Sequence, residues 1–175
     1  MRLAPRGWQQ RFFVVSVALT VLLTSSVGYA ETLTGRVVGV HDGDTVTVLD
    51  QFKRQHKVRL AGIDAPELGQ AFGRASRDHL AKLVSGKSVT VEWHKRDRYG
   101  RVVGKVQQGK IDAGFEQIRG GLAWHYKKYE QEQSEEDRAG YAGAQVIARG
   151  MRFGLWADNQ AIAPWIYRKL VSKAK

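Results

Sequence analysis

The stretch VRLAGIDAPELGQAFG, residues 58–73, places one basic and two acidic side chains within nine residues, separated by small and apolar ones. Arg59 lies in a run typical of a strand, while Asp64 and Glu67 flank Pro66, whose ring fixes the backbone φ angle. A solvated loop beside a strand is one explanation of this composition. A metal site with an arginine that binds phosphate is the other, and the rest of the chain has to decide between them.

The surrounding sequence has the pattern of a small β-barrel with helices. Five segments that are β-branched or strictly alternating predict short strands: 33–40, 45–49, 56–63, 88–94 and 101–107. Helical spacing of apolar residues predicts three helices, which lie within 70–86, 112–121 and 134–150. Ser134 is placed as an N-cap, and the basic tail, 164–175, is expected to be ordered only through Trp165. We therefore predict an α+β fold, a five-stranded OB-fold β-barrel with three α-helices.

Residues 1–30 have the layout of a secretory signal peptide. A basic start without acids precedes an apolar run at 12–23, and Gly28 and Ala30 then occupy the −3 and −1 positions of a cleavage site. The run is short for a transmembrane helix, which needs about 20 apolar residues, although an uncleaved N-terminal anchor stays an alternative. We expect one mature domain, 31–175, exported to the periplasm or secreted after cleavage near Ala30.

The chain is strongly basic and has no cysteine. Its 28 Lys and Arg against 17 Asp and Glu give a formal net charge of +11, which cleavage of the three-arginine leader would lower to +8. Such a charge favours polyanionic partners, either nucleic acid or an anionic membrane surface, although many basic proteins are merely soluble. The lack of cysteine excludes a disulfide framework and a thiolate zinc site.

Several acidic residues suit a hard cation. Asp42 and Asp44 flank Gly43 in a turn, and Asp64 ends a predicted strand, so Asp44 and Asp64 converge if the two strand ends are neighbours. Two carboxylates with backbone carbonyls and waters are typical ligands of Ca²⁺ or Mg²⁺. Asp-Gly is also the commonest hairpin turn signal, so Asp42 is equally explained as a turn residue. Glu67 can position or deprotonate a metal-bound water, or it can be an acid near a helix N-terminus.

Arginine and aromatic residues form a second group of candidates. The turn DRYGR, residues 97–101, supplies Arg98, Tyr99 and Arg101. Together with Arg59, two arginines from different strands could hold one phosphate with their planar guanidinium groups, although a surface arginine more often faces solvent. Tyr99 could stack on a base or donate to a phosphate. The segment WHYKKY, residues 124–129, mixes aromatic residues with lysines and is explained either as a nucleic-acid groove or as ordinary surface.

Taken together and in this order, the motifs DGDTV, VRLAGIDAPE, DRYGR, GLAW and GLW resemble those of the thermonuclease family, the staphylococcal nuclease-like enzymes, over 34–165. The resemblance implies an OB barrel with three helices. It also implies endonucleolytic hydrolysis of DNA and RNA that depends on Ca²⁺, with Mg²⁺ left open as the cofactor.

The resemblance assigns a metal set to this chain. By motif, Asp44 and Asp64 would be carboxylate ligands, and Ala65 would contribute its backbone carbonyl. Some members have Thr at the Ala65 position, and a carbonyl ligand survives that change whereas a hydroxyl contact would not. Glu67 would position or deprotonate the attacking water.

The resemblance also assigns the phosphate contacts. Arg59 and Arg101 would clamp the scissile phosphate, and three further residues would bind the neighbouring phosphate or nucleoside, namely Arg98, Tyr99 and Tyr129. Arg98 replaces the Lys of some members and keeps the charge. The loop LGQAFG after Glu67 is shorter than the Lys-rich loop of some members. How substrate is bound on that side of the site, and which substrate is preferred, is therefore left open.

Two rival functions remain at this point. A non-catalytic OB module that binds single-stranded nucleic acid would need the basic groove but not the acids, and acids in a phosphate groove cost affinity unless a metal neutralises them. A basic envelope-associated structural protein would need the N-terminal segment to stay uncleaved. We expect DNA and RNA as substrates, no stable protein partner, a monomer, and membrane association only if that segment is uncleaved.

Overall fold

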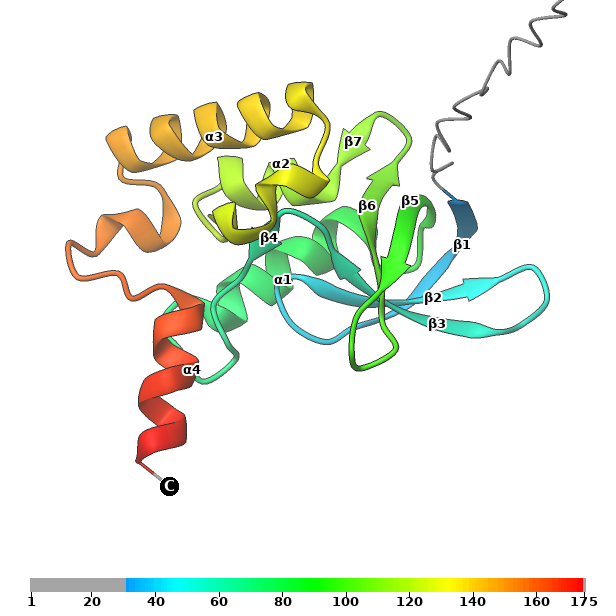
Figure 1. The fold of residues 1–175 in the computed structure, drawn as a ribbon, viewed down its shortest axis with the longest axis horizontal. Coiled ribbons are helices and arrows are strands. Elements are labelled where there is room, and N and C mark those ends of the chain that lie inside the picture. The colour runs from blue at the N-terminus through cyan, green and yellow to red at the C-terminus, as the bar shows by residue number, and fades with distance from the viewer. Residues whose placement is uncertain (1–30, 175) are drawn as a thin grey trace, which may run out of the picture.

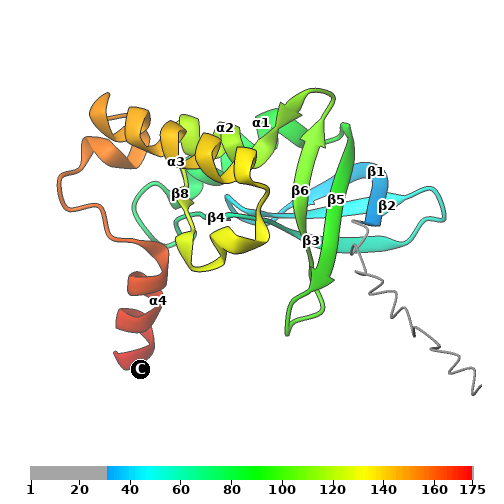
Figure 2. The same ribbon diagram turned by 45° about the horizontal axis from the view of Figure 1, so that its top comes forward.

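The computed structural model describes residues 31–174, and the predicted signal peptide therefore lies outside the described residues. Within this range no helix is long and apolar enough to cross a membrane. The described chain consists of a β-barrel that carries helices at one end (Figures 1 and 2).

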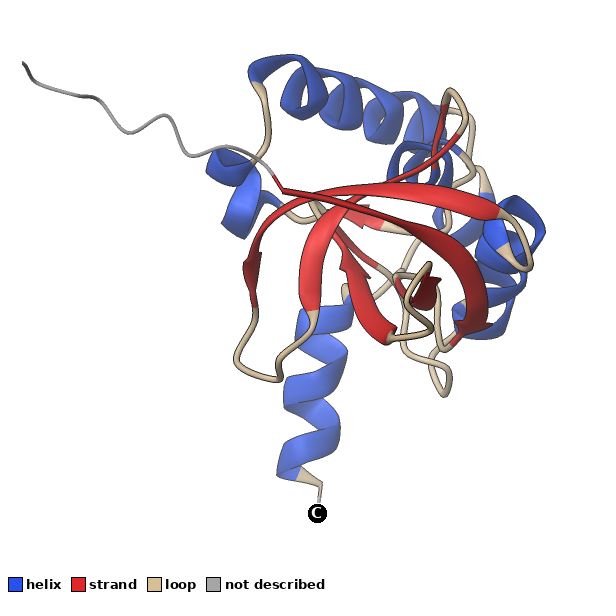
Figure 3. Ribbon diagram, turned by 90° about the vertical axis from the view of Figure 1, so that its right-hand side faces the viewer, coloured by secondary structure: helices blue, strands red, loops and turns tan. Residues whose placement is uncertain are grey.

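Five strands form a closed barrel (Figure 3). They are β1 (Glu31–Val40), β2 (Thr45–Asp50), β3 (Gln55–Leu60), β5 (Ser88–Arg96) and β6 (Val102–Gln108). Antiparallel pairing gives the order β3-β2-β1-β5-β6, and a parallel pairing of β3 with β6 joins the two edges. Closure removes the unpaired edges of the sheet. The predicted OB-fold α+β class is confirmed.

Alternation along the strands explains the barrel core. In β2, Val46 and Val48 are fully buried, and Val58, Val91 and Val106 from the neighbouring strands are buried with them. β-branched side chains suit a pleated surface that is covered on one face. This apolar cluster fixes the register of the strands, whose ends carry the polar residues of the groove.

One predicted strand is divided in two. The run at 56–63 was expected to be continuous, but β3 ends at Leu60 and Gly62 adopts a positive φ of 73°. The chain then forms the short strand β4 (Ile63–Asp64), which pairs with β8 (Trp124–His125) outside the barrel. The break takes Asp64 out of the barrel strands and into β4, where its carboxylate contacts Arg59. A further short strand, β7 (Ile111–Asp112), pairs antiparallel with the end of β6.

The three predicted helices are present as α1 (Gly73–Val84), α2 (Ala113–Arg119) and α3 (Glu135–Gly150), with 3₁₀ turns at Lys127–Glu132 and Gly154–Ala157. Ser134 caps α3 as expected, because its hydroxyl accepts from the Asp137 amide at 3.0 Å. A buried Tyr141 of α3 donates to the Asp112 carboxylate, which itself caps α2. The helical layer is thereby tied to the end of β6.

The expectation for the C-terminal tail was wrong. Residues beyond Trp165 are ordered as α4 (Pro164–Lys173), which leads away from the other helices (Figure 1). Pro164 is the first helical residue, a position where its missing amide hydrogen costs nothing. Pro164 is the one buried residue of this helix, whose large apolar side chains Ile166, Leu170 and Val171 are exposed.

Candidate active site

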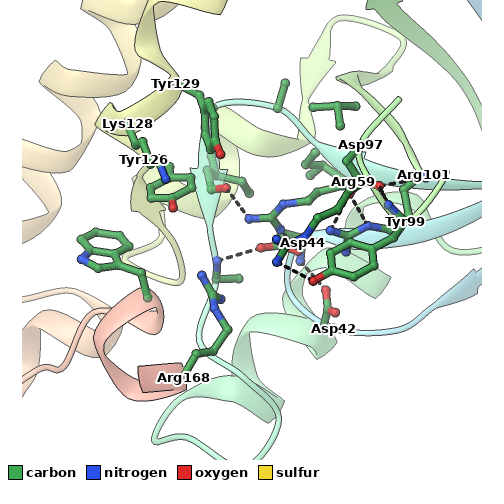
Figure 4. Close-up of a pocket in the computed structure, with 18 of the residues that line it drawn as sticks. Asp42, Asp44, Arg59, Asp97, Tyr99, Arg101, Tyr126, Lys128, Tyr129 and Arg168 are labelled. Atoms are coloured by element: carbon green, nitrogen blue, oxygen red, sulfur yellow. Dashed lines mark hydrogen bonds and ion pairs between the residues drawn. The ribbon is translucent and has the colours of Figure 1, made fainter. Parts of the chain in front are cut away.

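A groove of about 870 Å³ lies at the mouth of the barrel (Figure 4). Its walls come from four places: the β1–β2 turn, the segment from β3 to Glu67, the β5–β6 turn, and the surface formed by 126–132 with α4. Eight predicted site residues line it directly, namely Asp44, Arg59, Ala65, Glu67, Arg98, Tyr99, Arg101 and Tyr129. The ninth, Asp64, reaches the same place because its carboxylate contacts Arg59.

Arg59 connects the two predicted metal-binding acids. Its guanidinium forms an ion pair with Asp44 and donates to Asp64 Oδ1 at 2.9 Å. Asp44 also accepts from the Thr45 hydroxyl at 2.9 Å through Oδ1 and from the Ala65 amide at 3.0 Å through Oδ2. The convergence expected from the strand ends is therefore present, with an arginine placed between the acids.

Burial and the guanidinium act against each other on these acids. Burial alone would raise the pKa of Asp44, but the charge of Arg59, with hydrogen bonds from Ala65 and Thr45, lowers that pKa below its usual value. Burial raises the pKa of Asp64, although Arg168 and Arg59 oppose the rise. For Arg59 itself, burial would lower the pKa, and the two carboxylates raise it instead. Arg59 therefore stays charged.

Asp42 plays a different part from Asp44. Its Oδ1 accepts from the Asp44 amide at 2.9 Å, which is the local contact that stabilises a turn. Burial, followed by the nearby charge of Asp44, raises the pKa of Asp42 to about 6. This contact agrees with the interpretation of Asp42 as a turn residue, although the Asp42 side chain also lines the groove.

Glu67 lies at the edge of the groove with a side chain that is 39% exposed. Its backbone is packed tightly against the start of α1, because a Cβ added to Gly73 would lie 1.9 Å from the Glu67 carbonyl oxygen. Its carboxylate pairs with Arg168 of α4, Oε1 lying 2.8 Å from Nη1. The acid is thus accessible, and its main chain is fixed by the helix behind it.

The β5–β6 turn presents a second arginine to the groove. Asp97 accepts from the backbone amides of Tyr99 and Arg101 and from Nε of Arg101 at 2.7 Å. Burial would raise the pKa of Asp97, but these contacts with Arg101 lower it. Arg98 donates to the Tyr99 hydroxyl at 2.7 Å, and the Tyr99 ring is 68% exposed. Gly100 has a φ of 76°, which a residue with a Cβ rarely adopts.

The opposite wall of the groove is aromatic and basic (Figure 4). Tyr129 is half exposed, and the ammonium groups of Lys95 and Lys128 lie 5.0 and 5.5 Å from its ring centroid. Tyr126 stacks on Trp165 of α4 with ring centroids 5.2 Å apart. The segment WHYKKY therefore contributes to the groove and is not merely surface.

Sequence reasoning missed two groups of groove residues. Tyr126 and Lys128 were inside a quoted segment but were not singled out, although aromatic–basic alternation was a signal for them. Arg168 and Trp165 belong to the helix that was not expected. The signal that could have found this helix was Pro164 at its first position.

The donors at this site fit a hard divalent cation. Asp44 and Asp64 could supply carboxylate oxygens, and Ala65, which lines the groove, could supply its backbone carbonyl. These are the ligand types of Ca²⁺ and Mg²⁺. Among residues 31–174, no cluster of three or more His, Cys, Asp or Glu side chains could hold a metal by itself. Water molecules would therefore complete the coordination, as both cations readily accept.

Comparison of the sequence with known proteins finds relatives that are named as nucleases. The sequence profile of the family described as "Staphylococcal nuclease homologue" matches residues 57–158. An "Uncharacterized endonuclease" of Escherichia coli is 41% identical over 135 residues, which are 77% of this chain and 84% of the relative. A "Micrococcal nuclease" of Shigella flexneri is 36% identical over 168 residues, 91% of this chain and 94% of the relative. An "Uncharacterized endonuclease" of Haemophilus influenzae is 38% identical over 159 residues, 91% and 86% of the two chains.

The closed OB barrel with carboxylates and arginines at its mouth, together with these relatives, places the chain among the nucleases, enzymes that hydrolyse phosphodiester bonds. Within that class, the chain belongs to the staphylococcal nuclease family. The resemblance drawn from the five motifs is confirmed, and so is the prediction of a hydrolytic nuclease.

Proposed function

We propose that this nuclease is an exported endonuclease that uses a divalent cation, Ca²⁺ in preference to Mg²⁺, to hydrolyse phosphodiester bonds of DNA and RNA. The position of Arg59 carries the proposal, because it contacts Asp44 and Asp64 in the same groove that Arg101 lines. A phosphate in this groove would meet positive charge from β3 and from the β5–β6 turn, close to the carboxylate oxygens of Asp44 and Asp64.

The proposed metal ligands are Asp44, Asp64 and the carbonyl of Ala65. When bound, the cation supplies Lewis-acid polarisation of a phosphoryl oxygen and makes a coordinated water more acidic. Glu67 is the proposed residue that orients the attacking water and accepts its proton, because its accessible carboxylate lies three residues beyond Asp64 on the same rigid turn.

The proposed phosphate clamp consists of Arg59 and Arg101. Both guanidinium groups are already oriented by carboxylates, Arg59 by Asp44 and Arg101 by Asp97. Donors that are fixed before the reaction stabilise the charge that develops on phosphate oxygens without a cost of reorganisation. Arg98, Tyr99 and Tyr129 are proposed to bind the neighbouring phosphate or nucleoside, with Tyr99 exposed enough to stack on a base.

Export is supported by the sequence layout of residues 1–30, which lie outside the described structure. Mass spectrometry of the protein recovered from the cells that make it should find an N-terminus at Glu31. Recovery of the intact chain in the membrane fraction would favour an uncleaved anchor.

The experiment that tests the catalytic proposal compares metals and substrates directly. Purified protein is incubated with plasmid DNA and with RNA in the presence of Ca²⁺, Mg²⁺ or a chelator, alongside an Asp44→Asn variant. We expect cleavage of both substrates with Ca²⁺, none with chelator, and loss of cleavage in the variant. Cleavage that persists in chelator would contradict the metal assignment, and tight binding without metal-dependent cleavage would favour a non-catalytic OB module.

A further inference from the structure

The C-terminal helix α4 is attached to the catalytic groove on two sides. The Tyr167 hydroxyl donates to the Gly69 carbonyl at 3.2 Å, and Gln70 donates to the Ile162 carbonyl, which precedes the helix. Both contacts lie on the loop that directly follows Glu67. Trp165 stacks on Tyr126 on the other side of the groove. The helix therefore occupies a defined position beside the acids.

Arg168 points from α4 into the groove (Figure 4), and its guanidinium contacts two acids of the proposed site at once. Its Nη2 lies 2.7 Å from Asp64 Oδ2, and its Nη1 lies 3.2 Å from Asp64 Oδ1 and 2.8 Å from Glu67 Oε1. Both oxygens of Asp64 thus accept from this one guanidinium, and Oδ1 also accepts from Arg59. The planar fork of arginine makes such a bidentate pair more specific than a lysine could.

We propose that Arg168 is a tethered counter-ion that competes with the divalent cation for Asp64 and Glu67, so that α4 sets the metal affinity of the nuclease. The inference rests on the proposed function for the position of the cation. It adds a determinant of metal binding that lies outside the barrel, about a hundred residues further along the chain than the acids it contacts.

Electrostatics gives the direction of the effect. A cation that binds an Asp64 oxygen and a guanidinium that binds the same carboxylate carry charge of the same sign at close range, so each weakens the binding of the other. The side chain of Arg168 is 43% exposed, and solvent therefore screens the repulsion without abolishing it. The net effect should be a change of about tenfold in metal affinity.

Arg168 differs from Arg59 in how easily it can leave. The side chain of Arg59 is 17% exposed and lies on a barrel strand, where it pairs with Asp44 as well as Asp64. Arg168 lies on a helix in which Pro164 alone is fully buried, and its guanidinium can turn towards solvent without disturbing the core. Displacement by the cation is thus assigned to Arg168, while Arg59 stays in place to bind phosphate.

The test is direct calorimetric titration of Ca²⁺ into the full-length protein without nucleic acid. The variants are Arg168→Gln, Arg168→Lys and the matched control Lys173→Gln, which removes an equal charge from an exposed position of the same helix. We expect Arg168→Gln to bind Ca²⁺ about tenfold more tightly and Arg168→Lys to fall between it and the unmodified protein. Lys173→Gln should stay within about twofold, because an exposed charge farther from the acids is screened.

An Asp64→Asn variant keeps the two proposals distinguishable. If the unmodified protein binds Ca²⁺ through Asp64 but Arg168→Gln binds no more tightly, the competition is wrong and the metal site stands. Weaker binding by Arg168→Gln would likewise overturn the competition and make Arg168 a residue that supports the bound metal. If neither protein binds Ca²⁺, or if Asp64→Asn binds as well as the unmodified protein, the proposed metal site fails together with the inference.

Discussion

Asp97 orients Arg101 within the tight turn that joins β5 and β6. Nε of Arg101 donates to Asp97 Oδ2 at 2.7 Å, while the backbone amide of Arg101 donates to the other carboxylate oxygen at 3.0 Å. The acid therefore shapes the turn and aims the guanidinium with the same side chain. Arg101 is thereby held as a preorganised donor, although it lies on an exposed hairpin.

An Asp97→Asn substitution should separate these two roles. Asparagine keeps an oxygen that can accept from the turn amides, but it loses the charge that holds Arg101 Nε. We expect the single-turnover cleavage rate to fall by about tenfold to a hundredfold, because a misplaced donor stabilises the transition state poorly. The melting temperature measured beside it should change little. A rate equal to that of the unmodified enzyme would show that Asp97 does not act through Arg101.

Gly73 should be intolerant of a side chain because of Glu67. A Cβ at this position would lie 1.9 Å from the Glu67 carbonyl oxygen, so Gly73→Ala must displace the loop that carries the acid. We expect the free energy of unfolding in urea to fall by about 1–3 kcal/mol and cleavage to fall with it.

The matched control is Gly143→Ala in α3, where an added Cβ meets nothing within 4 Å. This change should leave cleavage unaltered and stabilise the helix by about 0.5–1 kcal/mol. Equal effects of the two substitutions on stability and cleavage would contradict the close approach of α1 to Glu67.

Tyr141 should make stability fall at alkaline pH. Burial, followed by the charge of Asp112 and the hydrogen bond to it, raises the pKa of the Tyr141 phenol above its usual value. The folded state thus keeps this proton to a higher pH than the unfolded state does. The resulting stability is fully present below about pH 10 and is lost as pH rises above it.

Tyr141→Phe removes this dependence. We expect it to cost about 1–2 kcal/mol of unfolding free energy at neutral pH, since the Asp112 carboxylate loses a buried partner. The difference between the two proteins in urea unfolding should shrink between pH 10 and 11. A difference that stays constant over this interval would mean that the phenol does not titrate differently in the two states.

Salt should weaken the binding of nucleic acid. The groove is lined by basic residues, and release of counterions from phosphates makes the logarithm of the affinity fall linearly with the logarithm of salt concentration. We expect this fall for single-stranded DNA bound in chelator, where cleavage is blocked. Lys128→Gln should reduce the slope by about one unit, and a flat salt dependence would argue against phosphate contacts in the groove.

Local sequence predicted much of this site, because the acids and arginines of each motif lie within a few residues of one another on one turn. DGD and RLAGIDAPE each place their side chains through short-range geometry, namely strand alternation and a stiff proline. The strand pattern likewise identified the barrel. Its closure through the parallel pairing of β3 and β6 is a long-range contact that periodicity does not encode.

Arg168 shows what local reasoning could not find. It contacts Asp64 across 104 residues of chain, and neither local motif indicates that these two segments meet. The break at Gly62 was missed for a related reason, since the apolar residues on both sides of it continue an alternating pattern.

The most direct test of the account is single-turnover cleavage of DNA by Glu67→Gln with Ca²⁺, measured together with its binding of DNA in chelator. Glutamine is isosteric with glutamate but does not accept a proton from water at neutral pH. We predict that cleavage falls by at least about a hundredfold while the dissociation constant for DNA changes by less than about threefold. Cleavage at the unmodified rate would contradict the account, because it would place the acceptor of the water proton elsewhere.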